Sequence, residues 1–308
     1  MRHPAVNPTG DSMANIQRDL HAPHVHHDME AIVTADVTRA LAEDVRDGDL
    51  TASLIAAHAR GHARVITRED GVLAGCDWFQ RCFTELDPDC EIFWHARDGD
   101  RVIADQQICE IDGSARAMLT AERSALNFLQ TLSAVATKTR LFVDLIAGTN
   151  AKILDTRKTL PGLRIALKYA VGMGGGYNHR IGLFDGILIK ENHIVAAGGI
   201  RAALDAARQL VRHGAPAETM IEIEVENMPQ LHEALECGAK LILLDNFTPA
   251  AMRNAVTFVA GKAELEASGG VNIKTVRTIA ETGVDRISIG TLTKDIQALD
   301  LSMRFKIN

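Results

Sequence analysis

The sequence contains no run of about 18 uncharged apolar residues, which excludes the usual kind of transmembrane helix. Its first residues also lack the stretch of roughly 7–15 apolar residues that a signal peptide needs, so we expect no secretory leader. Cysteine is scarce, and the five cysteines form an odd set without a CxxC pair: Cys76, Cys82, Cys90, Cys109 and Cys237. This usage argues against a disulfide scaffold or a zinc cluster and predicts a reducing, cytoplasmic location.

Basic side chains are also fewer than acidic ones. The chain has 33 basic and 40 acidic side chains, a net charge of −7, which disfavours a general nucleic-acid or anionic-membrane binder. Residues 156–190 are the exception: this window carries +5, which leaves −12 for the rest. A cationic island in an acidic protein can attract a small polyanion, although a basic surface loop would give the same count.

The 308 residues, 46% of them hydrophobic, suffice for one large or two smaller domains with a packed core. Residues 1–27 hold four histidines and little apolar periodicity, which favours a mobile polar tail over a metal site. Residues 28–130 mix a helical stretch (29–43) with short strand-like runs, and we predict an α+β sandwich domain. Residues 115–147 have helical spacing, as one long helix or two, and form the junction between the domains.

Residues 131–293 become regular after position 150, where short apolar runs alternate with capped helices that end at glycines. Strand–helix alternation of this kind predicts parallel strands with crossover helices. The predicted strands are 151–155, 186–190, 220–226, 241–245, 263–268 and 286–290. All six end in polar residues, which favours an α/β barrel over a doubly wound sheet, because barrel strands end together at one mouth. The last segment, 294–308, is expected to pack back on the N-terminal domain.

Two common phosphate-binding motifs are excluded. The glycine-rich stretch 171–176 lacks the third glycine of the dinucleotide-binding fingerprint and is followed by polar residues, and the P-loop pattern is absent. Backbone freedom near a ligand, or a loop hinge, is the interpretation we favour for these glycines.

Carboxylates on predicted strands are unusual, because strands of a parallel sheet are normally buried on both faces. Glu222, Glu224 and Glu226 alternate with aliphatic residues and therefore share one face, which is either a wet face or part of the mouth. At the mouth, Glu224 and Asp245 could bind a divalent cation or ribose hydroxyls. Lys190 ends an aliphatic strand, where a cation more often serves a ligand than snorkels.

Two glycine turns near helix starts, 268–270 and 290–291, offer unhindered backbone N–H groups that suit phosphate, although each could be an ordinary turn. The residues alone therefore predict a barrel enzyme for a phosphorylated, polyanionic substrate with Mg²⁺, and they do not name the reaction.

Five stretches closely resemble signatures of the quinolinate phosphoribosyltransferase family, also called nicotinate-nucleotide pyrophosphorylase (carboxylating). They are DTRKTLPGLR (155–164), GGGYNHR (174–180), DGILIKENH (185–193), LDNF (244–247) and GTLT (290–293). The resemblance runs from about residue 28 to 308 and implies an N-terminal sandwich domain and a seven-stranded barrel, one strand more than we find. It implies synthesis of nicotinate mononucleotide, CO₂ and pyrophosphate from quinolinate and phosphoribosyl pyrophosphate (PRPP) with Mg²⁺, a step of NAD biosynthesis.

The resemblance also implies roles for particular side chains. Arg157 and Arg180, with His179 nearby, would hold the two carboxylates of quinolinate together with Arg123, which would reach across from the partner subunit of an obligatory homodimer. The catalytic set would be Lys158, Lys190, Glu224 and Asp245, with the lysines neutralising the pyrophosphate and the carboxylates holding ribose or Mg²⁺. The phosphate would be held by Ser268, Gly269, Gly270, Ile289, Gly290 and Thr291, and Thr156 would belong to the substrate-binding residues.

Three alternatives stay open at this point. A related phosphoribosyltransferase could act without decarboxylation, a barrel lyase could use Lys190 as a Schiff-base amine, and a catalytically inactive chain could bind phosphate or serve assembly. Lys294 is a departure, because some members of the family carry a histidine there, so a contact at this position is in doubt.

Overall fold

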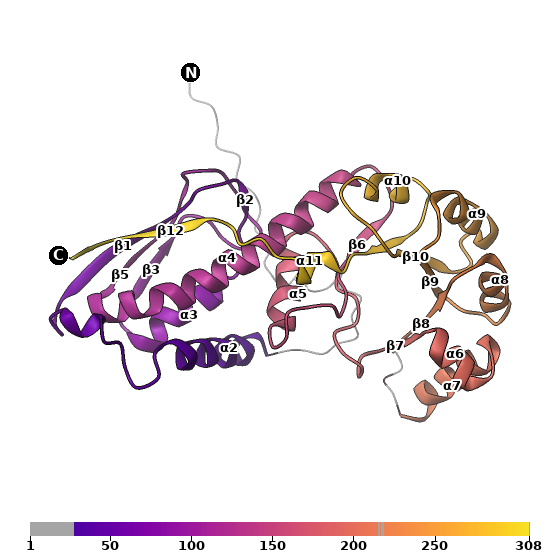
Figure 1. The fold of residues 1–308 in the computed structure, drawn as a ribbon, viewed down its shortest axis with the longest axis horizontal. Helices are drawn as coiled ribbons and strands as arrows, with labels where there is room; N and C mark the ends of the chain where they lie inside the picture. Colours follow the sequence, from indigo (N-terminus) through magenta and orange to yellow (C-terminus); the bar gives the residue numbers. More distant parts are fainter. Residues whose placement is uncertain (1–27, 215, 217–218, 308) are drawn as a thin grey trace, which may run out of the picture.

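The structure is a computed structural model that describes residues 28–214, 216 and 219–307, and the histidine-bearing tail of residues 1–27 lies outside them. It contains two main sheets of different kind, joined by one long helix (Figure 1). The first sheet is antiparallel, with the strand order β12 (Leu301–Ile307), β1 (Arg60–Thr67), β5 (Gln107–Ser114) and β3 (Glu91–Trp94). A small separate pair is formed by β2 (Gly71–Val72) and β4 (Arg101–Val102).

Helices α3 (Cys76–Leu86) and α4 (Ala115–Leu145) lie on one side of the antiparallel sheet, and α2 (Met29–Asp44) packs on these two helices (Figure 1). Alternate residues of β1 are buried, as expected for a strand with one face against a core. The sequence analysis did not predict α3, which begins after Gly75 in the left-handed conformation and buries a short cluster of aromatic side chains on one face. A short 3-10 turn, η2 (Ala52–Leu54), precedes the sheet.

Helix α4 is one continuous helix of 31 residues, and the expected domain boundary at residue 130 falls inside it. Its C-terminal half packs on α5 (Arg164–Met173) of the second sheet. A Cβ on Gly174 would lie 2.5 Å from the Ala136 carbonyl oxygen, and one on Gly176 would lie 2.7 Å from Thr139 Cγ2. At least these two glycines of the 171–176 stretch therefore serve close packing against α4, rather than a ligand or a hinge.

The second sheet is parallel and contains the six predicted strands. Their order in the sheet is β6 (Lys152–Leu154), β11 (Arg286–Ser288), β10 (Glu264–Ser268), β9 (Leu241–Asp245), β8 (Met220–Val225) and β7 (Gly186–Ile189). The connecting helices are α6 (Glu191–Ala197), α7 (Ile200–His213), α8 (Met228–Glu236), α9 (Pro249–Val259), α10 (Val276–Ala280) and α11 (Thr291–Lys294). Asn227 and Thr248 cap α8 and α9 as predicted. The helix expected from Asn272 begins only at Val276, because the Asn272 side chain accepts the Lys274 N–H in a turn.

The two ends of this sheet, β6 and β7, are not paired with each other in the described strands. The segment after α5 lies beside β6 instead, where Tyr177 forms a single parallel bridge with Leu154. From there the Arg180 guanidinium donates to the carbonyl oxygen of Gly186 at the start of β7, 2.9 Å away. Residues 177–180 are thus joined to β6 by a backbone bridge and to β7 by the Arg180 side chain, and they form no seventh strand among the described residues.

The C-terminal strand belongs to the antiparallel sheet. Strand β12 pairs antiparallel with the whole length of β1, so the last residues complete the first sheet (Figure 1). None of the helices in residues 28–214, 216 and 219–307 is both long and apolar enough to cross a bilayer.

Candidate active site at the carboxyl ends of the parallel strands

Polar side chains gather at the carboxyl edge of the parallel sheet. Glu224 lies near the end of β8, and Asp245 and Ser268 end β9 and β10, where they are register partners. Lys190 directly follows β7, and residues 155–158 follow β6. Because all six strands run in the same direction, these positions meet at one edge.

Charged groups of opposite sign lie together there. Lys190 Nζ donates to Glu224 Oε2 at 2.9 Å. Burial and the neighbouring Glu224 carboxylate raise the pKa of Asp245, whereas Lys190 and Lys158 act to lower it. The electrostatic coupling of these four side chains shows that the mouth brings two carboxylates and two ammonium groups into one site.

The two arginines expected to bind a diacid are also neighbours. Burial and the like charge of the Arg157 guanidinium lower the pKa of Arg180. Arg157 Nε is buried and has no hydrogen-bond partner among the described residues. A buried guanidinium donor without an acceptor is costly, and an anionic ligand would supply the missing acceptor.

The glycine turn after β10 is closely packed. Gly269 has φ +98°, and a Cβ there would lie 2.1 Å from Asn246 Oδ1. The Asn246 N–H in turn donates to the Ser268 carbonyl oxygen at 3.0 Å. Only glycine fits this position without displacing Asn246.

The turn after β11 is held against the cationic segment that follows β6. Thr293 Oγ1 donates to the Lys158 carbonyl oxygen at 2.8 Å, and the Lys158 N–H donates to Thr156 Oγ1 at 3.0 Å. A Cβ on Gly290 would lie 3.0 Å from Lys158 Cδ, while the preceding Ile289 is buried and Thr291 begins α11. The glycine turn and Lys158 therefore line the same part of the mouth.

Below the mouth, buried ionisable groups that the sequence analysis did not assign hold the segment of residues 178–180. Asp155 Oδ1 accepts a hydrogen bond from the His179 backbone N–H at 2.9 Å and forms an ion pair with Lys168. Lys168 Nζ also donates to the His179 carbonyl oxygen at 2.8 Å. Burial raises the pKa of Asp155 to about 6 and lowers that of Lys168. Lys168 was counted among the basic side chains of residues 156–190 but was given no role, because a lysine on an amphipathic helix has the pattern of a surface residue.

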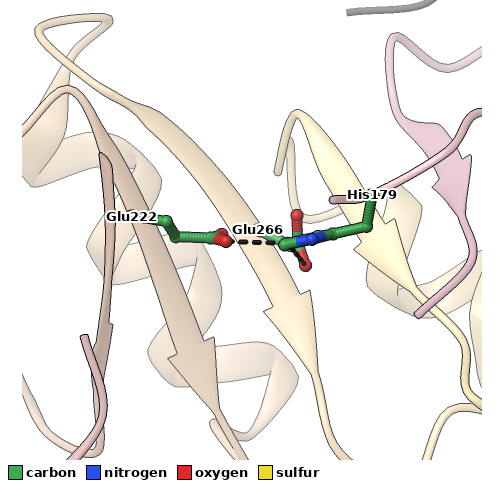
Figure 2. A group of neighbouring side chains, drawn as sticks. All are labelled: His179, Glu222 and Glu266. Carbon is green, nitrogen blue, oxygen red and sulfur yellow. Dashed lines mark hydrogen bonds and ion pairs between the residues drawn. The ribbon is translucent and has the colours of Figure 1, made fainter. Parts of the chain in front are cut away.

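A second buried group lies inside the sheet, where His179 Nε2 is 2.7 Å from Glu222 Oε2 and 3.7 Å from Glu266 Oε1 (Figure 2). Both glutamates are fully buried, and neither oxygen of Glu266 has a hydrogen-bond partner among the described residues. The signal for Glu222 was present in the sequence, because it shares a strand face with Glu224. Glu266 has the same pattern with Glu264 two residues before it, but this alternation was not used as a signal.

The buried Glu222 and Glu266 predict that the free energy of unfolding is higher at lower pH over a defined pH range. Burial raises the pKa of Glu222 to about 7 and that of Glu266 to about 8, from 4.5. Between pH 4.5 and about 8 the native state binds more protons than the unfolded chain. The free energy of unfolding therefore falls as pH rises through this range. We expect E266Q, which cannot ionise, to exceed wild type in unfolding free energy by roughly 4–5 kcal/mol at about pH 8.5 in urea titrations.

The matched control is E236Q, because Glu236 is an exposed glutamate at the end of α8 and lies outside the strands that carry Glu222 and Glu266. It should follow the wild-type pH dependence. An unfolding free energy for E266Q that declines with pH as steeply as wild type would show that Glu266 does not titrate in this window.

Comparison with known proteins agrees with this geometry. The family model described as quinolinate phosphoribosyl transferase, C-terminal domain, matches residues 135–304, and the N-terminal domain model matches residues 49–133. A relative from Bacillus subtilis (strain 168), named probable nicotinate-nucleotide pyrophosphorylase (carboxylating), is 41% identical over 261 residues, covering 85% of this chain and 89% of that protein. The chain belongs to the quinolinate phosphoribosyltransferase family.

Other members of the quinolinate phosphoribosyltransferase family match over similar lengths. Quinolinate phosphoribosyltransferase (decarboxylating) 1b of Nicotiana tabacum is 37% identical and covers 91% of this chain and 83% of its own. The solved structure of the nicotinate-nucleotide pyrophosphorylase from Francisella tularensis superposes with a TM-score of 0.87 at 43% identity, covering 94% of this chain and 99% of that one. The fold class predicted from the sequence is therefore confirmed.

Two residues considered from the family resemblance do not join the site within one chain. Arg123 is exposed on α4, 16 residues before Thr139, which is about 24 Å along a helix axis. Lys294 is exposed at the end of α11. Arg123 is therefore far along α4 from the part of the helix that packs against Gly174 and Gly176.

Proposed function

We propose that the mouth of the parallel sheet binds quinolinate between Arg157 and Arg180, beside PRPP. The chain is a decarboxylating quinolinate phosphoribosyltransferase of NAD biosynthesis, as the family models and many relatives show. Planar guanidinium groups bind carboxylates bidentately, and quinolinate has two adjacent carboxylates. The observation that carries this assignment is that the guanidinium groups of Arg157 and Arg180 lie close enough that, beyond the effect of burial, their like charges lower the pKa of Arg180.

PRPP fits the remaining groups of the mouth. Lys158 and Lys190 would neutralise its diphosphate, whose negative charge grows as the anomeric bond breaks. Thr156 lies between Lys158 and the Gly290 turn, where its hydroxyl can reach a phosphate oxygen. The backbone N–H groups of 268–270 and 289–291 would hold the 5′-phosphate.

Glu224 and Asp245 fit a magnesium ion that accompanies PRPP. Oxygen ligands suit this cation, and burial and the neighbouring Glu224 carboxylate raise the pKa of Asp245, which supports two carboxylates close enough to share a cation. When bound, Mg²⁺ would supply positive charge to the diphosphate leaving group. The same carboxylates can also accept hydrogen bonds from the ribose hydroxyls.

The reaction then needs no covalent enzyme intermediate. With quinolinate fixed by the arginines, its ring nitrogen attacks the anomeric carbon and the bond to pyrophosphate breaks, so that positioning lowers the entropic barrier. The ring nitrogen becomes quaternary and positively charged. It accepts the electron pair of the C–C bond as the neighbouring carboxylate leaves as CO₂, and a proton replaces that carboxylate on the ring. Lys190, in an ion pair with Glu224, serves charge neutralisation rather than Schiff-base formation.

We also propose an obligatory homodimer in the cytoplasm, with Arg123 completing the mouth of the partner subunit. The position of Arg123, far along α4 from the part that packs against Gly174 and Gly176, supports this, because a guanidinium exposed there is available to another copy. All five cysteines are buried and free, which supports a reducing compartment.

Turnover tests the proposed function directly. Purified protein incubated with quinolinate, PRPP and Mg²⁺ should release CO₂ and nicotinate mononucleotide in equal amounts. Nicotinate offered in place of quinolinate should react poorly, because one carboxylate leaves a guanidinium unpaired. Efficient use of nicotinate would favour a phosphoribosyltransferase that acts without decarboxylation.

Two other outcomes would favour the remaining alternatives. Borohydride trapping of a substrate on Lys190 would favour a lyase. Binding of PRPP without any turnover would indicate a catalytically inactive chain.

The glycine turn after β10 predicts a selective loss of PRPP affinity. In G269A the new methyl group would collide with Asn246 Oδ1 and displace the turn. We expect KM for PRPP to rise at least about tenfold and KM for quinolinate to change little, measured by initial rates. The control is G261A, because Gly261 also has positive φ but has no atom within 4 Å of the added Cβ. Equal increases in both KM values for G269A would place this turn outside the phosphate site.

A further inference from the structure

The segment that carries Arg180 lacks the hydrogen-bond ladder of a strand. Among the described residues, the only backbone pairing of this segment with β6 is the bridge at Tyr177. Residues 178–185 belong to neither sheet. The guanidinium of Arg180 nevertheless has to keep a fixed direction to bind a carboxylate bidentately. Other groups must therefore fix the backbone of Arg180.

The imidazole of His179 is one such group. Its Nδ1 accepts the backbone N–H of Arg180 at 2.8 Å, so this nitrogen must present a lone pair and cannot carry a proton. Its Nε2 lies 2.7 Å from Glu222 Oε2 and therefore carries the ring proton and donates it. An imidazolium would set an N–H at Nδ1 against the N–H of Arg180, and burial, which lowers the pKa of His179, also disfavours it.

Both ring nitrogens are thus occupied within the protein. The ring points between β8 and β10 toward Glu222 and Glu266, and the residue is 7% exposed (Figure 2). The backbone of His179 is fixed from the other side, because its N–H donates to Asp155 and its carbonyl oxygen accepts from Lys168. The histidine therefore links the buried network to the backbone N–H of Arg180.

We propose that His179 is a positioning residue, whose imidazole, kept as the Nε2–H tautomer by Glu222, holds the backbone N–H of Arg180 and so directs its guanidinium. Its ring does not contact the substrate. This inference rests on the proposed binding of quinolinate by Arg180, and it changes the role that the family resemblance implied for His179.

Two substitutions separate the functions of the two ring nitrogens. Asparagine places an amide oxygen near the position of Nδ1 and can still accept the Arg180 N–H, whereas glutamine reaches toward Glu222 and leaves that N–H without its acceptor. Neither side chain can carry a positive charge. A substrate contact through an imidazolium would therefore be lost equally in H179N and H179Q.

We expect KM for quinolinate to rise about five- to tenfold more in H179Q than in H179N, the scale of one lost hydrogen bond. KM for PRPP should stay the same in both variants. The control is H213Q, because His213 is exposed on α7, away from the mouth, and should behave as wild type. Equal losses in H179N and H179Q, or parallel increases in both KM values, would overturn the proposal.

A measurement on the unmodified protein avoids reliance on folding of the variants. In ¹⁵N-histidine-labelled protein, the His179 signals, assigned by their loss in H179N, should show a protonated Nε2 and an unprotonated Nδ1, with and without quinolinate. A doubly protonated ring in the quinolinate complex would overturn the proposal. Absence of turnover in wild type would instead contradict the proposed function, so the two failures are distinguishable.

Discussion

Replacing Arg180 with alanine should reduce kcat/KM for quinolinate by about 10²–10³-fold, because a charge-assisted, bidentate contact worth a few kcal/mol is lost. Affinity for PRPP should change by less than about threefold, since the lysines and glycine turns that hold it are intact. Steady-state kinetics with each substrate varied in turn, and equilibrium binding of PRPP alone, would measure both effects. R157A should show the same selectivity, because its guanidinium faces the same ligand.

Two variants control this experiment. R180K retains the charge but loses the planar, forked donor, so it should recover only part of the lost activity. R201A removes an exposed arginine on α7 and should be indistinguishable from wild type. Equal loss of quinolinate and PRPP affinity in R157A and R180A, with an unchanged melting temperature, would contradict the assignment of the two arginines to the diacid.

Mixing two inactive variants should restore activity if Arg123 serves the partner subunit. R123A and R180A should each be nearly inactive as homodimers. A mixed dimer has one mouth with an intact Arg180 that receives an intact Arg123, and random exchange of subunits should therefore return about a quarter of the wild-type sites. Turnover measured after joint refolding, or after co-expression with different tags, would show this recovery.

The same experiment contains its own control. R157A mixed with R180A should stay inactive, because every mouth in that mixture lacks one of the two arginines and no exchange can supply it. Recovery in this pair, full activity of R123A alone, or an active monomer in sedimentation would contradict a shared active site.

The parallel strands were predictable because they depend on local patterns. Each is a short aliphatic run, and the helices after β8 and β9 begin at Asn227 and Thr248, whose side chains cap them. The antiparallel part was harder. Strand β12 pairs with β1 across more than 230 residues of sequence, and α3 depends on packing of its aromatic face more than on any start signal.

Local sequence patterns were enough to predict the fold class, the family and the residue types of the mouth, because strand ends carry their polar side chains next to recognisable aliphatic runs. Only the tertiary structure decided what lies beneath them. Lys168 and Glu266 look like surface residues in the sequence, yet both are buried beside residues 178–180, where low dielectric makes each charge depend on a specific partner. The direction of the His179 ring depends on a backbone N–H and a distant strand. A pattern along one chain contains no record of such contacts, since they form only when segments far apart in sequence meet.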